Sequence, residues 1–230
     1  MKVRTLLPPT LVAVLAAACG DDDHATPTTS ASPSPATQTS MSFFVTSTTN
    51  TTGDLGGLAG ADARCQSLGA AAGQGARTWR AYLSVERDAG NGNAPTDARS
   101  RIGSGPWFNS AGVMVASDLA ALHARRGDAA VFLDERGQRI NGQWAGSPSP
   151  VQHDVLTGSN AEGRLMAGLT CGDWTSSSAS VQAQVGHSDG LGPGGDSSGS
   201  LSSWNSAHAN QSCADTAPRG GSGRIYCFAR

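Results

Sequence analysis

The sequence predicts an α+β domain of short mixed strands, two helices and long loops. Three observations support this prediction. Residues recur at helical spacing in only two stretches, brief β-rich segments are scattered along the chain, and runs rich in Gly and Ser separate them. Scattered strands with few helices are typical of α+β domains. Residues 42–230 are enough for one domain with a hydrophobic core.

Residues 1–18 have the organisation of a secretory signal peptide. Lys2 and Arg4 supply positive charge, and the apolar run that follows is too short to span a bilayer. It leads to Ala16-Ala17-Ala18-Cys19, which resembles the lipobox of bacterial lipoproteins, where the cysteine thiol is lipidated. Such boxes usually carry Leu where this chain has Ala16. The alternative is an ordinary A-x-A cleavage site, which would leave a secreted protein with a spare thiol.

Residues 19–41 are predicted to be the lipidated Cys19 followed by a disordered tether. This stretch is rich in Ser, Thr, Pro and Asp, and such a composition cannot bury enough apolar surface to fold. Its prolines favour an extended spacer. The first predicted partner is therefore a membrane, reached through the lipid anchor. Gly20 after the cysteine favours the outer membrane of a cell envelope, with the face that carries the domain left open.

The predicted elements of the domain begin with a β-rich segment at residues 42–47. A helix follows and ends at Gly73, because residues of one face recur at steps of three and four: Leu58, Ala61, Cys65, Leu68 and Ala72. Residues 78–84 alternate and predict a strand, whereas residues 88–97 predict a polar loop. Ser117 is expected to cap a second, short helix over residues 118–124.

The second half of the domain is predicted to contain short strands and loops. A strand is expected at residues 130–133 and an apolar terminal strand at 224–229. Further short strands are expected to contain Trp144, Val151, Val155 and Leu156. Residues 188–203 are rich in Gly and Ser and are predicted to be a loop, flanked by Cys171 and Cys213.

The four later cysteines are predicted to form two disulfides, since an exported chain passes into an oxidising compartment. They are Cys65, Cys171, Cys213 and Cys227. Four cysteines permit three pairings, and their spacing alone does not choose among them.

Several short strings, in order along the chain, resemble the endostatin domain, the C-terminal module of some collagens. They lie at residues 57–66, 78–84, 97–99, 131–132, 157–164, 171–174, 212–213 and 225–227. The chain is also similar to an uncharacterised group of bacterial lipoproteins with Trp-Arg-Ala-Tyr-Leu-Ser, Gly-Pro-Trp-Phe-Asn and Trp-Asn-Ser-Ala-His segments. The resemblance implies a C-type-lectin-like fold with nested disulfides, Cys65–Cys227 and Cys171–Cys213.

No metal or other cofactor is predicted from the sequence. Sugar-binding C-type lectins hold Ca²⁺ through a Trp-Asn-Asp triplet, but this chain has Trp204-Asn205-Ser206 and lacks the carboxylate. The N-terminal zinc site of endostatin does not transfer, because no histidine lies between His24 and His123. The remaining histidines show no paired ligand spacing and are expected to be surface or hydrogen-bonded side chains: His123, His153, His187 and His208.

Charge and motifs weigh against several other functions. Lys and Arg number 16 against 18 Asp and Glu, so no nucleic-acid partner is predicted. The arginines at residues 77–126 are interspersed with acidic residues, which favours an ordinary mixed surface over a heparin site. Residues 195–199 match Gly-x-Ser-x-Gly around Ser197, but no strand precedes and no helix follows, so no catalytic residue is predicted.

The function predicted is a non-catalytic binding or adhesion module for a glycan or protein, displayed on the cell envelope. Two loops, 88–97 and 188–203, are the expected contact regions, since recognition usually lies on loops. Their candidate residues, together with one from the Trp-Asn-Ser triplet, are Asp88, Asn91, Asn93, Asp97, Asp189, Asp196 and Asn205. The alternatives are an envelope hydrolase and a structural lipoprotein without a ligand. A Ser or carboxylate within hydrogen-bond reach of a histidine in a pocket would favour the hydrolase.

Overall fold

The computed structural model describes residues 40–230. The predicted signal peptide, Cys19 and nearly all of the tether lie outside the described residues. Met41 is already buried in the core, one residue before the predicted domain boundary. Within residues 40–230, none of the helices combines the length and the apolar character that crossing a membrane requires.

The described residues form a mixed α+β domain with three helices and ten strands. The helices are α1 (Gly57–Ala71), α2 (Leu119–Ala124) and α3 (Cys171–Trp174). The strands of the first half are β1 (Phe43–Val45), β2 (Trp79–Ala81), β3 (Val85–Asp88), β4 (Ala94–Thr96), β5 (Trp107–Phe108) and β6 (Met114–Ala116). Those of the second half are β7 (Asp154–Leu156), β8 (Gln184–His187), β9 (His208–Ala209) and β10 (Gly221–Ala229). Single 3₁₀ turns lie at Ala89–Asn91, Ala98–Ser100, Pro193–Gly195, Gly199–Ser202 and Pro218–Gly220.

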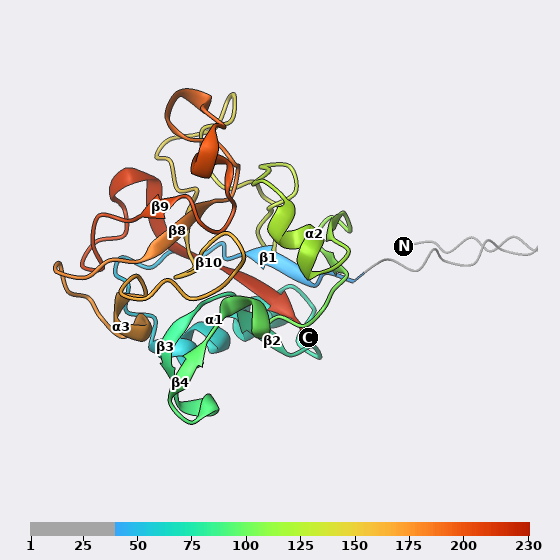
Figure 1. Ribbon diagram of the computed structural model, residues 1–230. Helices are drawn as coiled ribbons and strands as arrows, with labels where there is room; N and C mark the ends of the chain where they lie inside the picture. The colour runs from blue at the N-terminus through green and yellow to red at the C-terminus, as the bar shows by residue number, and fades with distance from the viewer. Residues whose placement is uncertain (1–39) are drawn as a thin grey trace, which may run out of the picture. The chain divides into compact units, whose positions relative to one another are not determined.

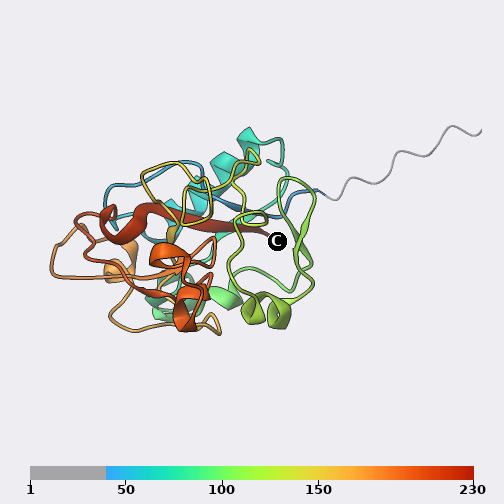
Figure 2. The ribbon, with the colours of Figure 1, turned by 90° about the horizontal axis from the view of Figure 1, so that it is seen from above.

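The longest strand, β10, organises the main sheet. The strand order is β1-β10-β7-β8-β9, and β2 also pairs with β10. The second half of β10 lies antiparallel to β1, with Phe44 opposite Cys227, and to β2, with Ala81 opposite Cys227. Its first half runs parallel to β7. β10, drawn in red, crosses the middle of the domain in Figures 1 and 2.

The sheet separates two hydrophobic clusters, because successive side chains of a strand point to opposite faces. On β10, Ile225 and Cys227 belong to one cluster, and Tyr226 and Phe228 to the other. The first cluster packs under α1, where a side chain at Gly69 would collide with the Trp79 indole. The second is mainly aromatic and includes Phe43, Tyr82, Trp107, Phe132 and Trp204. Both faces of the sheet are therefore buried.

Two disulfides join distant parts of the domain. Cys65 on α1 is bonded to Cys227 on β10, and Cys171 on α3 is bonded to Cys213. These are the nested pairs that the endostatin resemblance implies. Cys171 begins an unusual turn, since four consecutive residues have positive φ values, of 48, 60, 56 and 65°. The turn is held by the disulfide and by a hydrogen bond from Trp174 Nε1 to Ser84 O of 2.9 Å.

The structure differs from the predicted elements at several places. Two helices were expected, but the left-handed turn of α3 adds a third, which no helical spacing in the sequence signals. The predicted polar loop at 88–97 contains strand β4 as well as the tip of the β3–β4 hairpin. Trp144 and Val151 were expected in strands but lie outside them. Residues 130–133 are not a strand but a turn, with Val131 and Phe132 N–H both donating to Asp128 O. The cap of α2 is Asp118 and not Ser117, because the Asp118 carboxylate accepts from Ala121 N–H.

Candidate metal centre

Three neighbouring strands bring three histidines and one aspartate to one place. Asp154, the first residue of β7, lies directly opposite His187, the last residue of β8. His208, the first residue of β9, lies opposite Val185, two positions before His187 on β8. His153 immediately precedes β7. Residues far apart in the sequence thus meet where β7, β8 and β9 lie side by side.

The side-chain nitrogens of these histidines surround the Asp154 carboxylate. His153 Nε2 and His187 Nε2 each lie 3.3 Å from Asp154 Oδ1, and His208 Nε2 lies 3.5 Å from Oδ2. The rings of His153 and His187 stack with their centroids 4.3 Å apart. One ligand atom from each of His153, Asp154 and His187 lies within 4.8 Å of the others. These three side chains are almost fully buried, whereas that of His208 is 29 % exposed.

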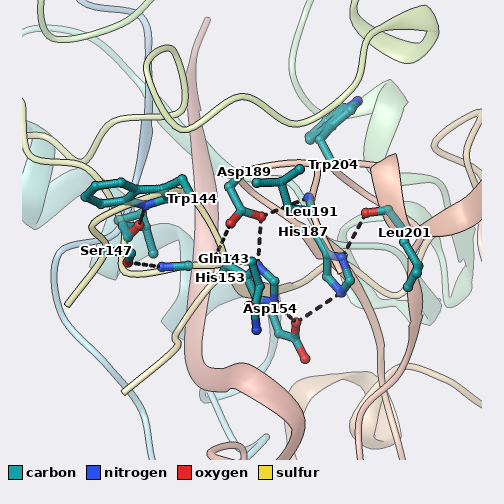
Figure 3. Close-up of polar contacts among 12 residues, drawn as sticks. Gln143, Trp144, Ser147, His153, Asp154, His187, Asp189, Leu191, Leu201 and Trp204 are labelled. Carbon is teal, nitrogen blue, oxygen red and sulfur yellow. Dashed lines mark hydrogen bonds and ion pairs between the residues drawn. The ribbon is translucent and has the colours of Figure 1, made fainter. Parts of the chain in front are cut away.

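The second ring nitrogen of each histidine fixes where its proton lies. Nδ1 of His187 lies 2.8 Å from Leu201 O, and Nδ1 of His208 lies 2.9 Å from Ala209 O. Nδ1 of His153 lies 2.7 Å from Asp189 Oδ1. A carbonyl or carboxylate oxygen can only accept a hydrogen bond here, so each Nδ1 carries the proton. Figure 3 shows the rings of His153 and His187 beside the Asp154 carboxylate. In a neutral ring with its proton on Nδ1, Nε2 carries the lone pair that a metal ion can bind.

The Asp154 carboxylate is buried without a hydrogen-bond donor. Neither of its oxygens has a hydrogen-bond partner among the described residues. Burial raises the pKa of Asp154 to about 6, although the neighbouring histidines act to lower it. Burial, together with the nearby His153 and His208, lowers the pKa of His187 to about 4. A buried carboxylate without a donor is costly unless a cation approaches it.

Asp189 holds the His153 ring from behind. Besides accepting from His153, its carboxylate accepts from Gln143 N–H at 2.6 Å and from Leu191 N–H at 3.1 Å. Burial acts to raise the pKa of Asp189, but the hydrogen bond and charge of His153 outweigh it and keep the pKa below its ordinary value. The chain comes this close because residue 142 is glycine, where a Cβ would collide with the Asp189 carboxylate.

This arrangement has the donor set of a transition-metal site. Imidazole nitrogen and carboxylate oxygen are ligands that Zn²⁺ accepts, in groups of four. Metal-binding histidines usually donate their other ring N–H to a carboxylate or carbonyl oxygen, as all three do here.

A cavity of about 350 Å³ lies beside the four side chains. The three histidines form part of its wall, and the remaining lining residues are Gln143, Pro193, Leu201 and Arg219. Pro193 and Leu201 come from the Gly- and Ser-rich loop 188–203, which sequence analysis had singled out as a contact region. The loop therefore contributes to the wall of the candidate centre.

The seven residues predicted to bind a ligand lie in different surroundings. Asp189 is the partner of His153, and Asp88 and Asn91 line a separate groove of about 860 Å³. Asn93 is exposed at the hairpin tip, and Asp97 accepts from Leu165 N–H. Asp196 is exposed and accepts from Ser198 N–H. Asn205 is buried and donates to Tyr82 Oη and to backbone oxygens.

The serine motif and the histidines do not meet in the structure. Ser197 is exposed, and the hydrogen bonds that His187 and His208 make within residues 40–230 do not include it. However, the His153–Asp189 pair does put a carboxylate within hydrogen-bond reach of a histidine in a cavity. That geometry is the one expected to favour the hydrolase alternative.

The sequence does not predict the centre, because nothing in its spacing relates His153, His187 and His208 to one another. The one local signal is the adjacent pair His153-Asp154 before an apolar strand. His123 differs from the other three, since its Nε2 lies 2.9 Å from Tyr82 Oη, away from the centre. No protein-family model matches this chain, and no curated protein matches it.

Proposed function

We propose that residues 40–230 form a metal-binding domain that holds a zinc ion. The ligands are Nε2 of His153, His187 and His208 and the carboxylate of Asp154. One observation carries this proposal: three Nε2 atoms converge on a buried carboxylate whose oxygens have no hydrogen-bond partner among the described residues. A divalent cation is the partner that satisfies all four groups at once.

The donor set favours zinc over other common ions. Ca²⁺ and Mg²⁺ prefer oxygen ligands, of which this centre offers only those of Asp154. Soft ions prefer thiolates, but all four cysteines of residues 40–230 are in disulfides. Ni²⁺ and Cu²⁺ also accept imidazole, so the choice among these ions is made by measurement.

Metal analysis of the purified protein tests the proposal. The wild-type protein is stripped with a chelator, dialysed against Zn²⁺, Ni²⁺ or Cu²⁺ in separate samples, and analysed for its metal content by plasma mass spectrometry. We expect one zinc ion per molecule, and a loss of at least 100-fold in zinc affinity for a His153→Ala/His187→Ala variant, by calorimetry. His123→Gln is the matched control and should bind zinc as the wild type does. A wild-type protein that retains no ion, or a double variant that binds as tightly, would overturn the proposal.

For the whole chain, we propose an exported lipoprotein anchored to the envelope through lipid on Cys19. Two disulfides in the domain support passage through an oxidising compartment. Their nested pairing, and the meeting of the first and last strands, support a C-type-lectin-like fold. On this view the metal centre belongs to a binding or adhesion module. The polar groove lined by Asp88 and Asn91 is a second surface suited to a glycan.

A metal-dependent hydrolase is the second candidate function. The specific observation in its favour is that the centre borders a cavity, since catalytic zinc sites keep a position open to substrate whereas structural sites are closed. The zinc-loaded protein is assayed against ester and peptide substrates, beside the His153→Ala/His187→Ala variant. Turnover that follows zinc content would favour the hydrolase, and its absence would favour the binding module.

A further inference from the structure

The cavity beside the metal centre has one cationic wall. Arg219 lines it, and its Nη1 lies 3.5 Å from Ala209 O. The same carbonyl oxygen accepts from His208 Nδ1 at 2.9 Å. Arg219 and the His208 ring therefore share one hydrogen-bond acceptor and lie next to each other. Arg219 is exposed, and no ion pair involves it within residues 40–230, so its guanidinium is free to bind a ligand.

The charges around the cavity favour an anion. A divalent ion and the single carboxylate of Asp154 leave a net positive centre, because the three histidines bind as neutral imidazoles. Arg219 adds a second positive charge. The nearby Asp189 faces His153 and the backbone of Gln143 and Leu191, and not the cavity wall. An arginine fork and a metal ion are both strong partners for a carboxylate.

The remaining lining residues indicate the chemistry of the uncharged part of the ligand. Pro193 and Leu201 supply apolar surface, and Gln143 adds a polar side chain. His208 is the most exposed of the four metal ligands, so the ion is approached from its side. Zinc sites that admit a further ligand hold the ion by three protein ligands, and their coordination can expand to five. A volume of about 350 Å³ lies at the lower end of the range for small-molecule sites.

We propose that this cavity binds a small aliphatic carboxylate, with one carboxylate oxygen on the metal ion and the other on Arg219. The inference rests on the proposed metal-binding function and names the ligand class of that site. Pro193 and Leu201 would contact the aliphatic chain. No bond is made or broken in this binding step.

Cobalt substitution tests the proposal and the metal site separately. The protein is loaded with Co²⁺, its metal content is measured, and its visible absorption is recorded as hexanoate is added, with hexanamide as the neutral control. We expect a saturable spectral change with hexanoate only. The Arg219→Gln variant should bind Co²⁺ normally and hexanoate at least 10-fold more weakly. Arg87→Gln, which changes an exposed arginine outside this cavity, should bind both normally.

The outcomes separate the two claims. A protein that binds Co²⁺ but shows no hexanoate-dependent change, or responds equally to hexanamide, overturns the carboxylate site and leaves the metal centre standing. Unchanged hexanoate affinity in Arg219→Gln overturns the assignment of Arg219. A protein that binds no ion overturns both the metal centre and the inference that rests on it.

Discussion

The Nε2 atoms of His187 and His208 lie 2.9 Å apart, although both rings carry their proton on Nδ1. When both rings are neutral, each Nε2 presents a lone pair, and the two lone pairs repel each other at this separation while Asp154 adds a negative charge beside them. Without a metal ion, these groups therefore lower the stability of the folded domain. With an ion bound, each of them becomes a ligand and raises it. This opposition between the apo and metal-bound states can be measured.

Asp154→Asn should have opposite effects with and without metal. In chelator, the Asn amide can donate to the histidine nitrogens. We therefore expect the free energy of unfolding of the variant to exceed that of the wild type by about 1–3 kcal/mol. In excess zinc, the wild type should be the more stable, because an ion at about 1,000 times its Kd adds roughly 4 kcal/mol. Thermal denaturation in EDTA and in zinc measures both. Equal ranking of the two proteins under both conditions would contradict the role of Asp154.

Asp189→Asn should weaken the metal site without removing a ligand. Asp189 fixes the tautomer and orientation of His153, and loss of such a partner typically reduces metal affinity about 10- to 100-fold. Zinc affinity by competition with a chromogenic chelator measures the change. Asp196→Asn, in the same loop but exposed, is the control and should leave affinity unchanged. Equal affinities for both variants would count against the Asp189–His153 pair.

Removing the outer disulfide should cost more stability than removing the inner one. Cys65–Cys227 closes 162 residues and Cys171–Cys213 closes 42. The chain-entropy model gives roughly 5 kcal/mol for the outer pair and roughly 4 kcal/mol for the inner pair. Paired Cys→Ala variants compared in urea provide the measurement. A larger loss for the inner pair would show that the left-handed turn at Cys171, and not loop closure, dominates.

Asp118→Ala should destabilise the domain through loss of a helix cap. The carboxylate of Asp118 accepts from Ala121 N–H at 2.8 Å, and this bond satisfies a backbone donor that the first turn of the helix otherwise leaves free. Ser117 donates to Asp118 but caps nothing itself, so Ser117→Ala should cost clearly less. The urea midpoints of the two variants show which residue caps α2. A larger loss of stability for Ser117→Ala than for Asp118→Ala would support Ser117, the cap predicted from the sequence.

Cys19 is expected to carry lipid in the mature protein made by a bacterial host. Mass spectrometry of the intact protein should show acyl mass on an N-terminal Cys19, and Cys19→Ala should release the protein from the membrane fraction. An unmodified mature form that begins elsewhere would leave a secreted protein. The domain fold does not depend on this outcome.

The sequence predicted the fold class because its signals are local. The steps of three and four from Leu58 to Ala72 give α1, and the apolar run at 224–229 gives most of β10. The metal centre could not be predicted in this way. β9 has only two residues, and β8 carries Gln184 and Gly186 among its four, so neither shows a strand pattern. Only the pairing of β7, β8 and β9 makes neighbours of His153, His187 and His208.

β10 also decides when this domain can form. It pairs with β1, β2 and β7, and its Cys227 forms the disulfide with Cys65. Residues 43–81 therefore cannot complete their pairing until residues 221–229 have been made. A nascent chain without Gly221–Ala229 lacks the strand that joins β1 and β2 to β7, and its Cys65 has no disulfide partner. Folding therefore completes only after synthesis has passed residue 229. The Cys65–Cys227 bond can likewise form only once the last strand has been made.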